Sequence, residues 1–333
     1  MRAALLEEFG SPLTLGEIEK PVAGPGEVLV RVAASGVNPL DLKLTAATAA
    51  RGGATQGRPT RLPAVLGMDL AGVVEEIGAG VAGFSPGDEV YGLTGGIGDL
   101  QGSLAEYAAV DAALLARKPE AVSLRESAAL PLAAITAWEA LVDRAQVHAG
   151  QKVLVHAGAG GVGHVAVQIA RARGAEVFAT GSAGKLAVIE RLGATPIDYT
   201  TTPVEEYVTQ YTGGEGFDVI LDTIGGTTLD ASFPAVRTYT GHVVSVLGWG
   251  AHDLTPLSLR GATYSGVFTL APMLTGRGRT HHGEILRDLA ALVDTGALRP
   301  VLDPRRFTLE TAADAHAAMG SGTAAGKVVV DVS

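Results

Sequence analysis

The feature that constrains this chain most is a cluster of glycines within GQKVLVHAGAGGVGHVAVQIAR (Gly150–Arg171). The run before the glycines, KVLVHAG, is almost continuously apolar, as in a strand that is buried on both faces. After the glycines, apolar residues recur at i, i+3, i+4, i+7 and i+8 from Val162, which places them on one face of a helix that Gly174 ends. A buried strand, a glycine-rich turn and a helix in this order predict the first part of a parallel βαβ unit.

The rest of the chain shows two kinds of pattern. Up to about residue 122, short strand-like runs alternate with glycine and proline, which is typical of a β-rich domain. From about residue 126, strand-like and helix-like runs alternate, which predicts an α/β fold with a doubly wound parallel sheet. The tail holds helix-like runs at His281–Val293 and Thr311–Met319 and then the strand-like GKVVVDV. The β-rich runs are GEVLVRVAASGV, DLAGVVEEIG, GDEVYGL and GSLAEYAAV (Gly102–Val110).

The glycines themselves fit the pattern G-x-G-x-x-G, as Gly158-Ala159-Gly160-Gly161-Val162-Gly163. In a turn between strand and helix, the first glycine permits the tight turn, the next lets the backbone approach a pyrophosphate, and the last lets helix and strand pack closely. The amides at the start of the helix then face the anion. This segment therefore predicts a dinucleotide site, and the alternative is a tight turn without a ligand.

The end of the second strand of this sheet indicates which dinucleotide binds. A site for NAD usually places an acidic residue there, which accepts a hydrogen bond from the ribose 2′-hydroxyl. Here the strand ends in Thr180-Gly181-Ser182, and the nearest acid, Glu176, lies at its start. Ser182 can donate to a 2′-phosphate and Lys185 can supply a positive charge. The segment therefore favours NADP(H), and the alternative for Lys185 is an exposed residue in a first helical turn.

The composition excludes several classes of function. The 333 residues carry a formal net charge of −10, so the surface repels phosphate backbones and anionic membranes, and we expect no nucleic-acid partner. The chain has no cysteine, which excludes disulfides, thiolate nucleophiles and cysteine-ligated zinc. No run of about 20 apolar residues occurs, so we expect no membrane span. The first residues lack the apolar core of a signal peptide, so we expect a cytoplasmic protein.

The whole stretch Gly150–Arg171 resembles the signature of a known family, the zinc-independent quinone oxidoreductase (zeta-crystallin-like) branch of the medium-chain dehydrogenase/reductase superfamily. The shared residues are Gly150-Gln151, Leu154, the glycines, Gln168 and Arg171. Further pieces agree in order along nearly the whole chain: GVNPLDLK, LPAVLGMDLAGVVEEIG, GDEVYGL, LPLAAITAWEAL, DTIGG and AAGKVVV. The resemblance implies a GroES-like catalytic domain, residues 1–122 and 270–333, and a Rossmann NADP-binding domain, residues 123–269.

The resemblance also bears on zinc. Zinc-dependent relatives hold the metal with a Cys, a His and a third Cys or Asp, and the matching positions here are Asn38, Met68 and about Leu132. None of these side chains is a useful zinc ligand, so we predict that no metal takes part. The pair His281-His282 does not change this prediction, because adjacent residues diverge by about 100° on a helix, and we expect both histidines to be exposed.

The resemblance, taken with the missing metal, predicts the reaction. Reduction of an activated C=C bond needs only a few hydrogen-bond donors to stabilise an enolate, whereas alcohol oxidation needs a Lewis acid or a strong base. We therefore expect NADPH-dependent hydride transfer to a quinone or an α,β-unsaturated carbonyl compound. The resemblance places Asn38 beside the nicotinamide as a donor to the substrate carbonyl, with a turn-forming role as the alternative. Asp41 and Lys43 either relay a proton or lie at the surface.

The remaining contacts also follow from the resemblance. Thr136 is similar to the threonine that contacts the nicotinamide, with a core helix position as the alternative, and Tyr199 to the tyrosine near the adenosine 2′-phosphate. Leu247-Gly248 should pass the nicotinamide ribose, and the backbone of Gly266–Phe268 should reach the carboxamide. Lys327 lies in the family's cofactor-contacting tail. His156 is interpreted as a strand residue and not as a catalytic base.

Two other functions stay open at this point. An enoyl-thioester reductase shares the fold and the hydride step, but only Arg277–Arg279 and Arg305-Arg306 form concentrated basic runs that would meet a CoA-type substrate. A cofactor-binding protein with a structural or regulatory role would bind NADPH without turnover. The resemblance also implies a homodimer in which ATYSGVF (Ala262–Phe268) pairs with its copy. Ala46–Arg61 lacks strand periodicity and predicts a surface loop, either solvated or acting as a lid.

Overall fold

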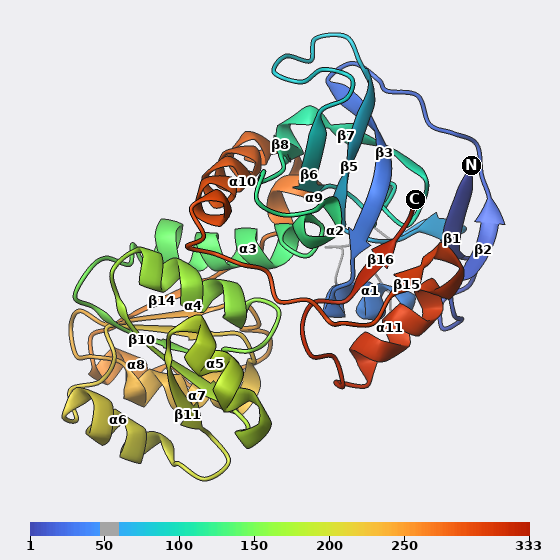
Figure 1. The fold of residues 1–333 in the computed structure, drawn as a ribbon. Helices are drawn as coiled ribbons and strands as arrows, with labels where there is room; N and C mark the ends of the chain where they lie inside the picture. Colours follow the sequence, from blue (N-terminus) through green and yellow to red (C-terminus); the bar gives the residue numbers. More distant parts are fainter. Residues whose placement is uncertain (47–59) are drawn as a thin grey trace. The chain divides into compact units, whose positions relative to one another are not determined.

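The computed structural model describes residues 1–46 and 60–333, which form two compact units (Figure 1). We call Met1–Leu132 together with Leu270–Ser333 the terminal unit, and Ala133–Thr269 the central unit. Most of the loop that we predict at Ala46–Arg61 lies outside the described residues. Every helix in the described part of the chain is too short or too polar to span a lipid bilayer.

The central unit is built on a parallel sheet. Its strands are β9 (Lys152–Val155), β10 (Glu176–Gly181), β11 (Thr195–Asp198), β12 (Val219–Asp222), β13 (His242–Ser245) and β14 (Thr263–Gly266). Their order in the sheet is β11-β10-β9-β12-β13-β14, and every neighbouring pair is parallel. The order reverses beside β9, so the predicted doubly wound sheet is confirmed, and the carboxyl ends of all these strands lie at one edge.

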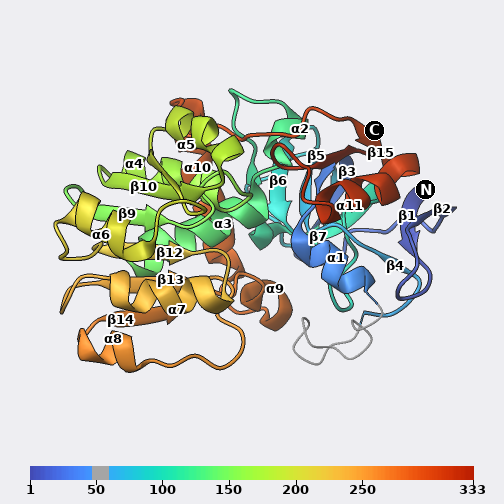
Figure 2. The same cartoon turned by 90° about the horizontal axis from the view of Figure 1, so that it is seen from below.

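Helices cover both faces of this sheet. They are α3 (Pro131–Trp138), which begins in the terminal unit, the π-helix η3 (Glu139–Arg144), α4 (Gly163–Ala172), the short 3₁₀ turn η4 (Ala183–Lys185), α5 (Leu186–Leu192), α6 (Val204–Thr212), α7 (Gly226–Ala235) and α8 (Thr255–Leu259). Figure 2 shows α4 and α5 on one face and α7 and α8 on the other. The apolar stripe predicted from Val162 onward is buried in α4, and Gly174, with φ of +84°, follows its end.

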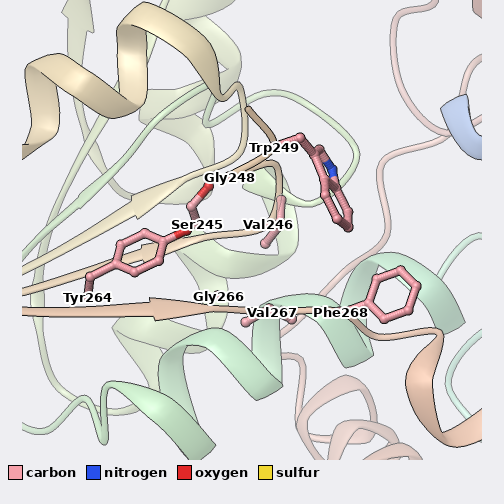
Figure 3. A pocket seen from close by; sticks show the side chains of 8 residues that line it. All are labelled: Ser245, Val246, Gly248, Trp249, Tyr264, Gly266, Val267 and Phe268. Carbon is pink, nitrogen blue, oxygen red and sulfur yellow. The ribbon is translucent and has the colours of Figure 1, made fainter. Parts of the chain in front are cut away.

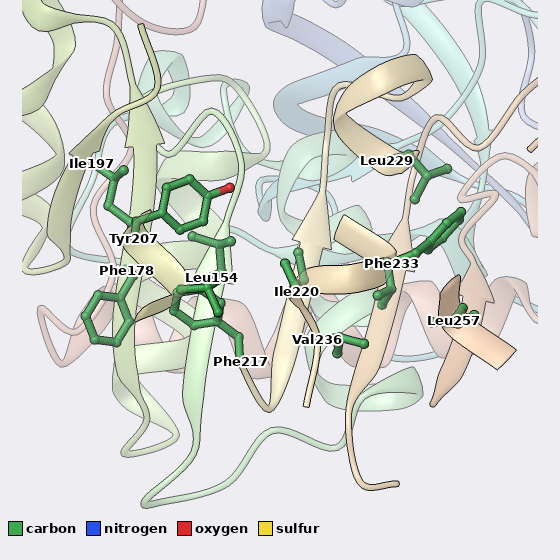
Figure 4. Packing of buried hydrophobic residues seen from close by; sticks show 13 residues of the cluster. Leu154, Phe178, Ile197, Tyr207, Phe217, Ile220, Leu229, Phe233, Val236 and Leu257 are labelled. Atoms are coloured by element: carbon green, nitrogen blue, oxygen red, sulfur yellow. The ribbon is translucent and has the colours of Figure 1, made fainter. Parts of the chain in front are cut away.

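The core of the central unit lies between the sheet and the helices on the α6–α7 side (Figure 4). Leu154 and Ile220, from the neighbouring strands β9 and β12, are fully buried there. The ring of Phe178 on β10 packs against Tyr211 and Phe217, with centroid separations of 4.9 and 5.5 Å. These apolar contacts hold the strands in register, so that residues just beyond their carboxyl ends keep fixed positions.

The terminal unit draws its strands from both ends of the chain. They are β1 (Arg2–Leu6), β2 (Thr14–Glu17), β3 (Glu27–Gly36), β4 (Ala64–Val65), β5 (Asp69–Ile77), β6 (Glu89–Leu93), β7 (Tyr107–Asp111), β8 (Leu115–Arg117), β15 (Phe307–Thr308) and β16 (Val329–Asp331). A small sheet has the order β2-β1-β4, and the larger one has β15-β16-β3-β5-β6-β8 with β7 also paired to β3. Because β16 pairs antiparallel with β3, the C-terminal tail is held against the N-terminal half.

The described part of the terminal unit also contains the helices α1 (Pro39–Thr45), α2 (Leu124–Ser127), α9 (Ala271–Thr275), α10 (Arg279–Asp294) and α11 (Ala312–Gly320), and the 3₁₀ turns η2 (Ala112–Leu114) and η5 (Leu309–Thr311). The helices predicted at His281–Val293 and Thr311–Met319 are thereby confirmed. The expectation of two exposed histidines is wrong for His282, which lies fully buried on α10, whereas His281 is exposed. The predicted strand Gly102–Val110 is shorter, because residues 102–104 instead bond to the backbone of residues 65–67.

Candidate functional site

The glycine-rich turn after β9 contains two kinds of glycine. Gly158 and Gly163 are buried, and a Cβ on either would overlap neighbouring atoms: 2.4 Å from Ala179 Cβ for Gly158, and 2.0 Å from the Ala157 carbonyl oxygen for Gly163. Gly160 is exposed, and its Cβ would come no closer than 3.1 Å to Ala157 O. The outer glycines are therefore needed for packing, whereas a Cβ on Gly160 would need only a shift of a few tenths of an ångström.

The residue with a left-handed backbone in this turn is an alanine, which stands directly before the first glycine. Ala157 has a left-handed φ of 53°, and none of the four glycines that follow it has a positive φ. The Thr180 hydroxyl stabilises this conformation by accepting a hydrogen bond from Ala157 N at 3.1 Å. Gly158 lies inside the turn that the hydrogen bond from Gly160 N to the Ala157 carbonyl closes at 2.8 Å, and its lack of a side chain allows the turn to pack closely against β10.

His156 stabilises the same turn through its contacts with Thr180 and Ser232. Its Nδ1 lies 3.2 Å from Thr180 Oγ1 and its Nε2 lies 3.2 Å from Ser232 Oγ, so the buried ring links β9, β10 and α7. Burial lowers the pKa of His156 to about 4, which keeps the ring neutral at physiological pH. This placement agrees with the interpretation of His156 as a structural residue.

The residues that are predicted to bind the 2′ position of the adenosine ribose lie close to Gly181. Ser182 follows it directly, Tyr199 N donates to the Gly181 carbonyl at 3.3 Å, and Lys185 Cβ lies 3.4 Å from where a Cβ on Gly181 would stand. The register of β10 and β11 also pairs Gly181 with an acid, Asp198, which sequence order did not reveal. The Asp198 carboxylate accepts hydrogen bonds from Thr200 N and Thr200 Oγ1. These bonds satisfy one of its oxygens within the turn after β11.

A cavity of about 260 Å³ lies at the carboxyl ends of β13 and β14 (Figure 3). It brings together three of the residues predicted to pass the nicotinamide, Gly248, Gly266 and Phe268, while Leu247 lies in the same loop. Val267 belongs to the predicted segment Gly266–Phe268, whereas the other lining residues were not assigned to the cofactor from the sequence: Ser245, Val246, Trp249 and Tyr264. Their position in the sequence could have indicated them, because each lies within a few residues of the carboxyl end of a parallel strand, where ligands bind in such sheets.

A buried carboxylate supports the polar side of this cavity. Asp222 accepts hydrogen bonds from Gly225 N at 3.0 Å and from Ser245 Oγ at 2.7 Å, and Ser245 Oγ in turn accepts one from Leu247 N. These bonds fix the loop after β13. A Cβ on Gly248 would stand 2.1 Å from the Tyr264 hydroxyl, so Gly248 is needed for this close approach.

Thr136 lies on α3 and is almost fully buried. Its Oγ1 is 2.9 Å from Thr269 Oγ1, and Thr269 Oγ1 donates to Glu139 Oε2 at 3.1 Å. The side chain thus takes part in a hydroxyl–carboxylate chain within the central unit. Both earlier interpretations of Thr136, a nicotinamide contact and a helix position in the core, are compatible with this placement.

In the terminal unit, three predicted or neighbouring polar side chains form one buried network. Asn38 Nδ2 donates to Asp69 Oδ2 at 2.9 Å, and the Lys327 ammonium donates to Asn38 Oδ1 and, at 3.2 Å, to Asp69 Oδ2. Asp69 Oδ1 accepts a further bond from Leu132 N at 2.7 Å. Asn38 and Lys327 therefore use their polar atoms inside the protein, and a bond from either to a ligand would require an exchange of partners.

Asp41 and Lys43 lie on the same helix but in different environments. Asp41 is fully buried, and its Oδ2 accepts a hydrogen bond from Asn38 N at 2.7 Å at the start of α1. Lys43 is exposed on the same helix. Burial raises the pKa of Asp41 to about 7, and the nearby Asp69 carboxylate adds to this, while the bond from Asn38 N and the Lys327 ammonium oppose it.

The raised pKa of Asp41 predicts a pH effect on stability. Between pH 4 and 7 the folded protein holds a proton on Asp41 that the unfolded chain has lost, so this group lowers the free energy of unfolding by up to about 1.4 kcal/mol per pH unit as pH rises. His156 and His316, with pKa values lowered by burial to about 4, act in the opposite sense. We therefore expect Asp41→Asn to lose stability relative to the wild type at pH 5 but to regain it by pH 7.5.

Urea unfolding of both proteins across this pH range measures the difference, in which the histidine contributions cancel. Parallel pH dependences for the two proteins would show that Asp41 keeps an ordinary pKa in the fold.

The side chains of Asn38, Met68 and Leu132, which the resemblance matches to the zinc ligands of zinc-dependent relatives, are poor ligands for a metal. At the first position, Asn38 is bonded to a lysine ammonium, whose positive charge would repel a cation. Met68 is buried and Leu132 contributes its backbone amide to Asp69, so neither supplies a ligand for zinc. Within residues 1–46 and 60–333, no group of three His, Asp or Glu side chains is arranged to hold a metal ion.

Comparison with known protein families identifies two domains. Residues 24–120 match the model of the alcohol dehydrogenase GroES-like domain, and residues 192–330 match a model described as zinc-binding dehydrogenase. The chain is 35% identical to the NADPH-dependent alkenal/one oxidoreductase, chloroplastic, of Arabidopsis thaliana, over 99% of this chain and 79% of that protein. It is also 37% identical to the spectinabilin polyketide synthase system protein NorB of Streptomyces orinoci, over 86% of this chain but only 12% of that much longer protein.

Solved structures agree with this assignment. An alcohol dehydrogenase superfamily protein from Novosphingobium aromaticivorans is 52% identical, with a TM-score of 0.95 over 100% of both chains. The quinone oxidoreductase from Coxiella burnetii is 30% identical, with a TM-score of 0.84 over 100% of this chain and 99% of that one. The α/β fold with a GroES-like domain and a Rossmann-type sheet is thereby confirmed. The chain belongs to the medium-chain dehydrogenase/reductase superfamily.

Proposed function

We propose that this protein is an NADPH-dependent oxidoreductase that reduces quinones or α,β-unsaturated carbonyl compounds without zinc. The observation that carries the cofactor site is Gly160. Neither a left-handed backbone nor a severe steric overlap accounts for a glycine at this exposed position, whereas the approach of a pyrophosphate does. The names of the relatives, an NADPH-dependent alkenal/one oxidoreductase and a quinone oxidoreductase, support the cofactor and the substrate class.

The residues of the central unit fit NADPH along its length. The turn at Gly160–Gly163 and the start of the ten-residue helix α4 would hold the pyrophosphate, with Val162 and Gly161 contributing backbone amides. Ser182, Lys185 and Tyr199 would surround the 2′-phosphate. The loop at Leu247-Gly248 and the segment Gly266–Phe268 would hold the nicotinamide end in the cavity. We accordingly propose residues 123–269 as the NADP-binding domain, and residues 1–122 with 270–333 as the catalytic domain.

A bound NADPH supplies a hydride, and the protein must orient the substrate and provide a proton. Of the two candidates on α1, we propose that the exposed Lys43 faces substrate or water, and that the buried Asp41 fixes the start of the helix. The side-chain amide of Asn38 is bonded to Lys327 and Asp69. We therefore propose that Asn38 forms part of the wall of the substrate site and does not donate to the substrate carbonyl. Thr136 would contact the nicotinamide while its hydroxyl stays bonded to Thr269.

The proposal is tested by titrating protein treated with a chelator with NADPH and with NADH, following nicotinamide fluorescence, and then adding 1,4-benzoquinone or methyl vinyl ketone. We expect tight NADPH binding and oxidation by at least one acceptor in the absence of metal. Binding without oxidation across a wide acceptor panel would favour the structural or regulatory alternative. A requirement for added zinc would contradict the proposed mechanism.

Lys185→Ala should weaken NADPH binding selectively. Loss of a charge-assisted bond to the 2′-phosphate is worth about 1.5–3 kcal/mol, so we expect the Kd for NADPH to rise about 10- to 100-fold while that for NADH changes little. Arg191→Ala removes an exposed cation from α5, the helix that directly follows Lys185, and serves as a matched control. Equal losses for the two cofactors in Lys185→Ala would remove the assignment of Lys185 to the 2′-phosphate.

An enoyl-thioester reductase is the second candidate. The similarity to a segment of a polyketide synthase system protein, and to the solved structure of the CurK enoyl reductase at 27% identity and a TM-score of 0.85, favours it. Crotonyl-CoA and a crotonyl pantetheine ester discriminate the two candidates. A kcat/KM for these thioesters well above that for simple enones would make the thioester the preferred substrate.

We further propose that the protein forms a homodimer. β14 ends the strand order of the central sheet and pairs with β13 on one side, which leaves an edge that a second copy can extend. Exposed apolar residues of the central unit, Leu254 and Leu259, lie in the segment just before this strand. The cytoplasmic location stays a prediction from the sequence.

A further inference from the structure

The cavity at β13 and β14 carries an aromatic side that NADPH binding alone does not explain. The indole of Trp249 is 64% exposed, although a ring of this size is usually covered by other side chains. It meets the ring of Phe268 edge to face, with centroids 5.9 Å apart and planes at 87° (Figure 3). This contact fixes the position of the indole and leaves most of its surface open.

The size of the cavity limits what it holds. At about 260 Å³ it lies just below the usual range of ligand pockets, so it has room for about one ring system, which the proposed function assigns to the nicotinamide. Figure 3 shows Tyr264 and Ser245 toward one end of the cavity and Trp249 and Phe268 toward the other. Trp249 directly follows Gly248 and lines the same cavity, so in the proposed function its ring would lie beside the nicotinamide end of the cofactor.

We propose that Trp249 is a specificity-determining residue that binds flat, conjugated acceptors, namely quinones and aryl enones. Hydride transfer requires the acceptor to lie about 3–3.5 Å from the nicotinamide, and therefore beside the residues that line the cavity. A planar ring packs against the exposed indole with both dispersion and quadrupole attraction. A short aliphatic enone offers little surface for this contact. The inference rests on the proposed function and narrows its substrate class.

The test compares two acceptors in steady-state assays at saturating NADPH. We expect Trp249→Ala to lower kcat/KM for 1,4-naphthoquinone about 3- to 10-fold, mainly through KM, and to change that for methyl vinyl ketone less than about twofold. Trp249→Phe should restore most of the loss, and the Kd for NADPH should not change. Tyr239→Ala is the matched control, because Tyr239 is an 84% exposed aromatic residue before the opposite end of β13 and should affect neither acceptor.

Three results would overturn the inference. Equal losses for both acceptors, or weaker NADPH binding, would show that Trp249 only supports Phe268 and the nicotinamide end. A change of oligomeric state in Trp249→Ala, measured by light scattering, would assign the indole to an interface between copies. Failure of the proposed function is recognised separately, because the wild-type protein would then oxidise NADPH with neither acceptor, and the inference would fall with it.

Discussion

Lys327→Met should lower the stability of the terminal unit by about 3–5 kcal/mol, the usual loss when one partner of a buried ion pair is removed. Lys327 is 3% exposed, and its ammonium bonds to Asp69 Oδ2, Asn38 Oδ1 and the Val37 carbonyl. Methionine fills a similar volume, so the loss comes from the buried, unpaired carboxylate of Asp69. For a unit of this size the midpoint of thermal unfolding should fall by on the order of 10 °C.

Calorimetry together with hydrogen exchange measures this effect. The chain has two compact units, so the loss of amide protection should be found in β3, β5 and β16 and not in the central sheet. The double variant Asp69→Asn with Lys327→Met removes both charges. The Asn38 amide can then turn over, so that its Oδ1 accepts a hydrogen bond from the side-chain amide introduced at position 69. We expect the double variant to be more stable than Lys327→Met alone. A double variant less stable than the single one would show that the network is held by packing and not by charge.

The sequence predicted those features that depend on local pattern. The apolar run before Gly158 and the helical periodicity after Val162 are signals within about 20 residues, and both elements occur where expected. The same holds for the helix at His281–Val293. The buried face of this helix was less evident. Histidine is a polar residue that is not usually assigned to a core, so His282 was wrongly expected at the surface.

Contacts between distant segments could not be predicted in this way. Lys327 and Asn38 are 289 residues apart, and only the pairing of β16 with β3 brings them together. The cofactor contact that the resemblance suggests for Lys327 stays a prediction, and the internal bonds of its ammonium could not be read from the sequence. Asp198 is a similar case: it stands 22 positions after Glu176 in sequence, and the register of two parallel strands places it beside Gly181. Strand register is set by packing across the whole sheet, which a local pattern does not encode.

Two glycine-to-alanine variants in the turn after β9 should separate the function of the turn from its folding. In Gly163→Ala the new Cβ would meet only backbone: Ala157 O at 2.0 Å, Ala157 C at 2.8 Å and Gly158 Cα at 2.9 Å. Backbone atoms at the junction of β9 and α4 cannot move away cheaply, so we expect a loss of stability of at least about 1–3 kcal/mol. NADPH binding should weaken in this variant because the turn itself is displaced.

Gly160→Ala should give the opposite combination. Its Cβ would meet only Ala157 O at 3.1 Å and Ala157 Cβ at 3.7 Å, and its φ is not left-handed, so the folded protein should lose less than about 1 kcal/mol. Gly160 is exposed, and in the proposed function the pyrophosphate approaches the backbone at this residue, so an added methyl group should raise the Kd for NADPH at least about 10-fold. Thermal unfolding without cofactor and fluorescence titration with NADPH measure the two effects separately. If Gly160→Ala bound NADPH as tightly as the wild type, the turn would be a structural connection, and the dinucleotide would have to be sought elsewhere in the protein. A stable Gly160→Ala with weak binding, beside an unstable Gly163→Ala, would instead show that one glycine serves the ligand and the other serves the fold.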